Sequence, residues 1–238
     1  MMPRTSQILQ AVIKEFIETG SPVSSKKLCK KRDFGVKDAT IRNELNFLMQ
    51  EDYLEQPHTS SGRVPTDKGY RFLAEQTMAD FAAHLEFGIT RTLAALKEEF
   101  ARREFEDFVG DMSAELALLG VGYAPREQEI YKSGLDELFT HFVSDYDVSD
   151  SRELFQIVKD FEMIDERMAE LLNFVSKSGE PRVFIGKSPI TKSRELSVIA
   201  DRYETGGEPF LVAAVGPKRM DYPKNLRFFR QLREVISN

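Results

Sequence analysis

The sequence predicts an α+β protein: a helical domain with a short hairpin in front, a helical segment in the middle and a small mixed domain at the back. Apolar residues recur at helical spacing through most of residues 1–119, and most of the strand-like runs follow residue 120. The charge is also divided, because residues 1–75 hold 12 Lys/Arg and 10 Asp/Glu while residues 76–238 hold 21 and 29. A basic front and an acidic back suggest two tasks, with any polyanion bound at the front.

Bulk composition predicts a cytoplasmic protein that does not enter a membrane. The 238 residues contain a single cysteine, Cys29, so no intrachain disulfide can form and a reducing compartment fits best. No apolar run approaches the length of a membrane span, and the N-terminus lacks the pattern of a signal peptide.

Three helices are predicted in the first domain. Residues 5–19 carry an apolar stripe that Gly20 closes, and Ser24 is placed to cap a short helix over 25–31. A third helix covers residues 36–52, where Ile41, Leu45 and Leu48 share one face. The opposite face carries Ala39, Asn43, Asn46 and Gln50, flanked by Arg42 and Phe47.

Two short strands follow these helices, at residues 53–56 and around Val64, and Thr66 is placed to cap a helix that starts at Asp67. Three helices followed by two strands and a loop predict a winged helix-turn-helix, whose third helix enters the major groove. The loop residues 60–63 are then the tip of the wing. We expect Gly62 to supply a positive φ and Arg63 to reach phosphate or the minor groove.

The exposed face of the third helix gives the first candidate DNA contacts. Asn is a poor helix former whose amide can pair with adenine, so Asn43 and Asn46 are expected to contact bases. Arg42 could bind guanine or only phosphate, and the sequence leaves both open. Ala39 and Thr40, near the helix N-terminus, could touch a thymine methyl or a phosphate oxygen.

The second helix and the wing give the remaining candidates. Lys26 and Lys27 belong to a basic run over 26–32 that is either a solvated face or a phosphate contact. His58, Thr59 and Ser60 lie in the wing. His58 has no neighbours with metal-ligand or nucleophile spacing, so we expect it to shape the wing, and we expect no enzyme activity, metal or cofactor.

The rest of the chain is expected to form a helical linker over 76–119, with a register shift near Arg102-Arg103, and a small α+β domain over 120–238. Residues 205–208 are predicted to turn a hairpin, and Asp221 to cap the last helix. A 3,4 spaced apolar stripe runs from Leu154 to Val175. It could be a dimer seam, but Val158 and Leu172 widen it and favour a helix packed on its own sheet.

Three blocks carry a family resemblance: "TGSPVSSKKL" at 19–28, "ATIRNELNFL" at 39–48 and "EQPHTSSGRVPTDKGYRF" at 55–72. In them the sequence resembles the heat-inducible transcription repressor family HrcA, with weaker similarity at "SGLDELF", "RVFIGKS" and "VGPKRMDYPKNLRFFRQL". The resemblance implies a winged helix followed by a GAF-like domain with an inserted dimerisation domain. It further implies a dimer that binds an inverted-repeat operator of chaperone genes, with the chaperonin GroEL as modulator. Arg42 and Asn43 then match the reading helix, and His58, Thr59, Gly62 and Arg63 match the wing.

Two departures from the family pattern are visible. Lys37-Asp38 stand where Ser-Pro is common, so Asp38 is expected to be the substitute cap. The chain is also shorter than typical members, with the missing part falling between about 119 and 133. It is therefore expected to be a variant without the inserted dimerisation domain, with a reduced GAF-like sheet of five short strands. Dimerisation must then use the helices within 76–119 or 154–175.

These observations predict a sequence-specific repressor that binds double-stranded DNA at an inverted repeat as a homodimer. Two alternatives remain open. One is a winged-helix regulator whose back domain senses a small molecule, and the other is a winged helix used as a protein-interaction module, which would bind DNA weakly and without salt dependence.

Overall fold

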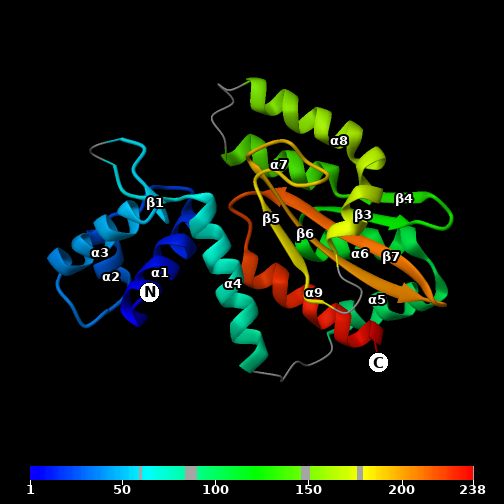
Figure 1. The fold of residues 1–238 in the computed structure, drawn as a ribbon, viewed down its shortest axis with the longest axis horizontal. Helices are drawn as coiled ribbons and strands as arrows, with labels where there is room; N and C mark the ends of the chain where they lie inside the picture. Colours follow the sequence, from blue (N-terminus) through cyan, green and yellow to red (C-terminus); the bar gives the residue numbers. More distant parts are fainter. Residues whose placement is uncertain (59–60, 84–89, 146–150, 176–178, 238) are drawn as a thin grey trace. The chain divides into compact units, whose positions relative to one another are not determined.

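The computed structural model describes residues 1–58, 61–83, 90–145, 151–175 and 179–237 (Figure 1). The chain divides into two compact units, Met1–Thr77 and Met78–Asn238. Helices and strands both contribute to the fold, as the α+β prediction requires. No helix in the described part of the chain is both long enough and apolar enough to cross a bilayer.

Unit 1 contains three helices, a two-stranded sheet and the start of a fourth helix, in the order that the sequence predicts. Strands β1 and β2 pair antiparallel, and an isolated bridge between Val23 and Arg63 adds the link between α1 and α2 to this sheet. The elements are α1 (Pro3–Thr19), α2 (Ser25–Lys31), α3 (Asp38–Gln50), β1 (Leu54–Glu55), β2 (Val64–Pro65) and α4 (Asp67–Ala83).

Most of the predicted helix ends in unit 1 are confirmed by their hydrogen bonds. Gly20 ends α1 in the left-handed region with φ 62°. The Ser24 hydroxyl accepts from the amide of Lys27, and that of Thr66 accepts from the amide of Gly69. The prediction that Asp38 caps α3 is wrong, because Lys37 holds the cap position and Asp38 is the first helical residue. There its carboxylate favours the positive end of the helix dipole.

Unit 2 is built on one five-stranded sheet with the order β4-β3-β7-β6-β5, in which every neighbouring pair is antiparallel. Five strands were predicted, but two of them are long, at ten residues each. The strands are β3 (Leu119–Ala124), β4 (Glu129–Ser133), β5 (Arg182–Ile185), β6 (Leu196–Thr205) and β7 (Glu208–Pro217). The helices are α5 (Arg91–Arg102), α6 (Phe105–Leu116), α7 (Leu135–Asp145), α8 (Ser151–Leu171), the 3-10 turn η1 (Leu172–Phe174) and α9 (Tyr222–Ser237).

The predicted β6–β7 hairpin is confirmed. Thr205 pairs with Glu208, and Gly206 and Gly207 between them have φ of 59° and 81°. Two consecutive positive φ values suit a two-residue turn that follows the twist of the strands. The predicted cap of the last helix is also confirmed, since the Asp221 carboxylate accepts from the amide of Lys224 at 3.0 Å.

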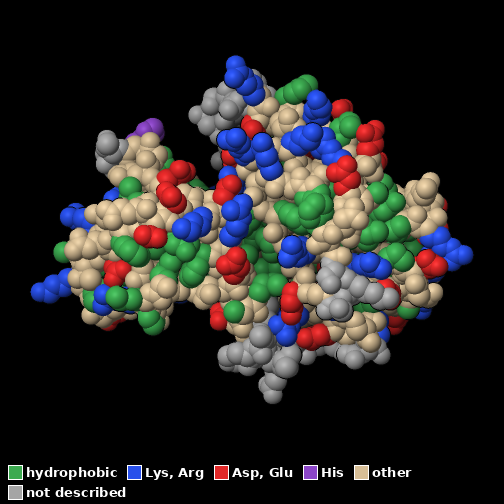
Figure 2. All heavy atoms as spheres, in the orientation of Figure 1, with side chains coloured by type: hydrophobic (Ala, Val, Ile, Leu, Met, Phe, Trp, Pro, Cys, Tyr) green, Lys and Arg blue, Asp and Glu red, His purple; other side chains and the backbone are tan. Residues whose placement is uncertain are grey.

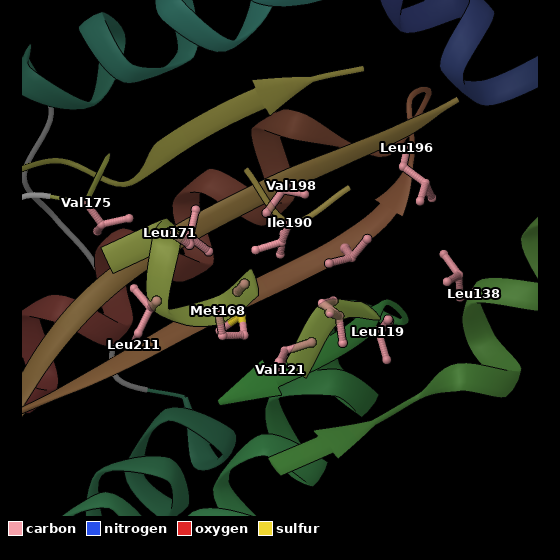
Figure 3. Packing of buried hydrophobic residues seen from close by; sticks show 14 of the residues in the cluster. Leu119, Val121, Leu138, Met168, Leu171, Val175, Ile190, Leu196, Val198 and Leu211 are labelled. Carbon is pink, nitrogen blue, oxygen red and sulfur yellow. The ribbon is translucent and has the colours of Figure 1, made fainter. Parts of the chain in front are cut away.

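Helices cover both faces of this sheet, so β6 and β7 are buried nearly throughout (Figure 1). On one face, α7 and α8 pack over the odd-numbered residues of β7, and Figure 3 shows Met168 and Leu171 of α8 close to Leu211 and Val198. On the other face, Phe210 of β7 contacts aromatic rings of α5 and α6.

Two predictions about helices in this unit are settled by packing. The segment expected as a linker is part of unit 2 from α5 onward, because Phe100 and Phe108 pack against Phe210. The predicted register shift is real, since Arg103 has φ 62° and separates α5 from α6. From Ile157 to Val175 the apolar stripe of α8 packs on its own sheet, as favoured, and this part is therefore not a dimer seam. Leu154, the first residue of the stripe, remains 37% exposed.

Candidate nucleic-acid interface

Helix α3 is held by three apolar side chains that point into unit 1. Ile41, Leu45 and Leu48 are each at most 1% exposed, as their spacing predicts. Polar contacts at its edge add to this, because Glu44 accepts from Arg4 at 2.9 Å and from the hydroxyl of Thr5 at 2.8 Å. The rotation of α3 about its axis is thereby fixed, and so is the set of side chains that it presents to solvent.

The outward face of α3 is polar with one aromatic ring. Ala39, Arg42, Asn43 and Asn46 are exposed, while Thr40 is half-buried. Phe47 also belongs to this face and leaves 46% of its surface in solvent. From the sequence, Phe47 was expected to flank the face and was not named among the DNA contacts. The signal that could have identified it is an aromatic residue four positions after Asn43, one turn along the same face.

Arg42 forms an ion pair with Asp38 at the start of α3. Its Nη2 atom lies 2.9 Å from the carboxylate of Asp38, one turn earlier, and both side chains remain substantially exposed. An exposed pair at this spacing is worth only a few tenths of a kcal/mol. Arg42 can therefore leave Asp38 for a phosphate or a base at little cost.

Arg63 connects the strand pair to α3. Its Nη2 atom donates to Oδ1 of Asn46 at 3.0 Å, and its Nε atom lies 3.2 Å from the sulfur of Met49. Its backbone is bonded to Val23 in both directions, at 2.8 and 2.9 Å. The expectation that Arg63 stands at the tip of the loop is wrong, because these contacts hold it at the base. It fixes the orientation of the Asn46 amide instead.

The loop between β1 and β2 is organised by Ser61. The Ser61 hydroxyl accepts from the amide of His58 at 3.0 Å and contacts its carbonyl oxygen at 2.7 Å. Gln56 donates from Nε2 to the Ser61 carbonyl at 2.9 Å. His58 thus shapes the loop through its main chain. Thr59 and Ser60 lie outside the described residues.

Gly62 is required for a different reason from the one predicted. It does not have a positive φ. A Cβ atom at this position would lie 2.5 Å from the carbonyl carbon of Val23 and 2.6 Å from that of Pro22. Glycine is needed because the chain between α1 and α2 passes directly against the backbone of the loop.

The two candidate lysines of α2 lie in different surroundings. Lys26 is exposed, whereas Lys27 is half-buried and its Nζ lies 2.8 Å from the carboxylate of Glu15 on α1. Lys31 contacts the same carboxylate at 2.6 Å. Hydrogen bonds from Lys27 and Lys31 lower the pKa of Glu15 below its ordinary value. Lys27 is thus held in an ion pair within unit 1, and Lys26 remains available for a phosphate.

Unit 2 has a hollow of about 320 Å³ between the starts of α5 and α9. Side chains of both charges line it, among them Glu115, Asp221 and Lys224. Lys224 donates to the carbonyl of Glu115 at 2.8 Å. Small-molecule pockets are mostly apolar with a few polar groups, so this lining does not favour a sensor. No group of His, Cys, Asp and Glu within the described ranges is placed to hold a metal ion.

Comparison with known families decides the relationship. The family model described as "HrcA protein C terminal domain" matches residues 71–226, which is more than half of the chain. The chain belongs to the HrcA family. The model covers β3 to β7 and most of unit 2, whereas the motifs that first indicated HrcA lie almost wholly before residue 71.

Curated HrcA relatives match less than half of the chain. The protein named "Heat-inducible transcription repressor HrcA" from Acetivibrio thermocellus is 49% identical over 75 residues, 32% of this chain and 21% of the relative. The protein of the same name from Carboxydothermus hydrogenoformans is 38% identical over 109 residues, 46% of this chain and 29% of the relative. The matched region therefore spans between a fifth and three tenths of the length of these relatives.

One solved structure shares the fold. It is described as "Crystal structure of a hypothetical protein at 2.2 A resolution" and superposes with a TM-score of 0.75. The superposition covers 100% of this chain and 98% of the other, at 18% sequence identity. The arrangement of elements is thus found in another protein.

Proposed function

We propose that this HrcA-family chain is a sequence-specific DNA-binding transcriptional repressor. Met1–Thr77 is then a winged helix-turn-helix, α3 is the helix that enters the major groove, and the sheet of unit 2 is a reduced GAF-like domain. The observation that carries the proposal is the exposed row of Asn43, Asn46 and Phe47 on a helix whose other side is fully buried. Amide and apolar side chains in such a row suit the edges of bases.

The relatives support a regulatory role, because they are named heat-inducible transcription repressors. The resemblance in the first unit adds heat-shock and chaperone genes as targets and GroEL as a modulator of binding. Repression is steric in this proposal, since a repressor bound at its operator excludes the polymerase.

The bound form is a homodimer on an inverted repeat. One recognition helix reads only a few base pairs, too few to select one site in a genome. A two-fold pair of chains doubles the number of base pairs read and fixes the spacing of the half-sites. The two-fold symmetry of the dimer then requires an operator whose two half-sites form an inverted repeat.

Asn46 and Arg63 act together in this proposal. With Oδ1 of Asn46 bonded to Arg63, the amide Nδ2 group is directed away from Arg63 and can donate to a base acceptor. Arg63 is therefore a positioning residue, and Lys26 and Arg42 are the candidates for phosphate contact. The rival use of the same unit as a protein-interaction module predicts weak DNA binding that hardly depends on salt.

Selection of bound sequences from random double-stranded DNA by the purified full chain tests the proposal. We expect enrichment of an inverted repeat. Asn43→Ala should then weaken binding to the selected repeat by about 1–3 kcal/mol and leave random DNA almost unchanged. Asn173→Ala, an exposed Asn in unit 2, is the matched control and should change neither affinity. Absence of any enriched sequence, or equal losses on both DNAs for Asn43→Ala, would refute a reading role for α3.

A further inference from the structure

Helix α8 exposes apolar side chains on the side that faces away from the sheet. Phe155 is 70% exposed, and Leu154 and Val158 are 37% exposed each. Three large apolar side chains within five residues of one helix differ from the scattered single exposures that are normal on a surface. They lie at the start of the helix, where Figure 2 shows hydrophobic and basic spheres next to each other.

The outer face cannot be turned inward, because α8 is fixed to unit 2 by its other side. Ile157, Ile164 and Met168 are at most 2% exposed in the sheet-facing core. The buried carboxylate of Asp160 accepts from the amides of Lys192 and Ser193 at 2.7 Å each. A rotation of α8 that buried Phe155 would break these two hydrogen bonds and leave the amides of Lys192 and Ser193 without their acceptor.

Charge on this outer face is divided between the two halves of the helix. Its first half presents Lys159, and its second half presents Glu162, Glu166 and Glu170, all exposed. Within the described ranges none of these four takes part in an intrachain ion pair. The face is therefore complementary to a copy of itself that runs in the opposite direction.

We propose that α8 pairs antiparallel with α8 of a second copy of this chain, about a two-fold axis near residue 161. The helix runs from Ser151 to Leu171, so this axis passes through its midpoint and the two helices overlap over their full length of roughly 30 Å. Lys159 then lies opposite the partner's Glu162, and the reverse contact repeats by symmetry.

In the same antiparallel register, the exposed ring of Phe155 can pack against α8 of the second copy. Phe155 lies six residues before the axis, at the level of the partner's residue 167. The nearest outward-facing positions there are Glu166 and Ala169, and the small side chain of Ala169 leaves room for a ring. Val158 approaches the partner's Met163 in the same way. An aromatic anchor beside opposite charges is typical of the residues that dominate interface energies.

This inference rests on the proposed function, because a symmetric operator is what requires a second copy. It names a surface for the dimer other than the part of the apolar stripe from Ile157 to Val175, which is buried in its own unit. Pairing of α8 with a second copy of itself requires opposite charges in the two halves of the helix. A partner of different sequence would not require this division.

Sedimentation velocity of the full chain without DNA, over a range of protein concentrations, tests the pairing. We expect a dimer whose dissociation constant rises roughly tenfold or more in Phe155→Ser. Phe47→Ser, which removes an exposed ring from unit 1, is the matched control and should leave the dimer unchanged. Lys159→Glu and Glu162→Lys should each weaken the dimer, and the double variant should restore it, because the exchange recreates the opposite charges across the axis.

A monomer at all concentrations, an unchanged dimer in Phe155→Ser, or a double variant that stays weak would overturn the pairing. These outcomes are separate from those of the selection on random DNA. A chain that dimerises through α8 and yet enriches no inverted repeat would remove the repressor function and leave the pairing in place.

Discussion

Phe47 extends from the same side of α3 as Asn43, one helical turn further along, and almost half of its side chain is in contact with solvent. Exposure of a large ring on a helix of a small unit has an energetic cost unless a partner covers it. In the proposed complex the partner is the floor of the major groove. The apolar group available there is the C5 methyl of thymine, which Phe side chains contact in protein–DNA complexes.

We therefore expect Phe47→Ala to weaken binding to the selected operator by about 1 kcal/mol at positions that hold thymine. Replacing that thymine by uracil removes only the methyl group. The replacement should weaken binding by the wild-type chain and have no further effect on Phe47→Ala, as titrations of the four combinations would reveal. If the methyl matters equally to both proteins, Phe47 does not contact it.

The sequence predicts the exposure of some single residues, but it does not predict the contacts of others. Asn43 and Asn46 were predictable as exposed, because helical spacing alone decides which side of α3 is buried. The contact between Arg63 and Asn46 was not, since the two lie 17 positions apart and meet only through the packing of the strands on α3. The need for Gly62 likewise depends on the backbone of Val23, which no local pattern in residues 57–72 reveals.

At the scale of elements, α2 shows how a basic run is divided by its neighbours. The helix carries four lysines in seven residues, which the sequence alone cannot separate into DNA contacts and internal pairs. In the structure Lys27 and Lys31 turn toward Glu15 of α1, and Lys26 turns to solvent. A lysine releases counterions from DNA when it binds a phosphate, and the number released grows with the number of such contacts. A lysine that is already paired with a carboxylate of the protein contributes less to this release.

The salt dependence of DNA binding should separate these lysines. Lys26→Ala is expected to reduce the slope of log K against log salt by about one unit, because one phosphate contact is lost. Lys27→Ala removes the same charge from the next position and is the matched control. Its slope should change much less, because Lys27 is paired with Glu15. Equal changes in both variants would show that the pairing with Glu15 does not persist on DNA.

Element predictions from local chemistry mostly succeeded, the cap at Asp38 excepted, whereas one that depended on packing failed. Caps at Ser24, Thr66 and Asp221 were readable, because a hydroxyl or carboxylate at a helix start has one usual role. The apolar stripes of α5 and α6 were recognised too, yet they were assigned to a linker. A stripe shows that a helix has a buried side but not what covers it, and here the cover is the sheet of unit 2.

At the scale of the whole molecule, the two units contain carboxylates with opposite pKa shifts. In unit 1, hydrogen bonds from Lys27 and Lys31 lower the pKa of Glu15 from its ordinary value of 4.5. Its contribution to stability is therefore complete above pH 4.5 and lost as the pH falls further. In unit 2, burial and then the nearby charge of Asp111 raise the pKa of Glu99 to about 7. The folded unit 2 thus holds a proton that the unfolded chain releases near pH 4.5.

For Glu99 the sign is the reverse of the usual carboxylate case. Between pH 4.5 and about 7 the folded state binds more protons than the unfolded state, so the stability of unit 2 decreases as the pH rises through this window. We expect calorimetry to show a higher unfolding temperature for unit 2 at pH 5 than at pH 8, while unit 1 gains nothing from Glu15 over the same range. Glu99→Gln should flatten this dependence and raise stability at pH 8, since the amide is neutral at both pH values. Glu98→Gln, its 69% exposed neighbour, is the control and should keep the wild-type slope. A slope that persists unchanged in Glu99→Gln would mean that another group holds the proton.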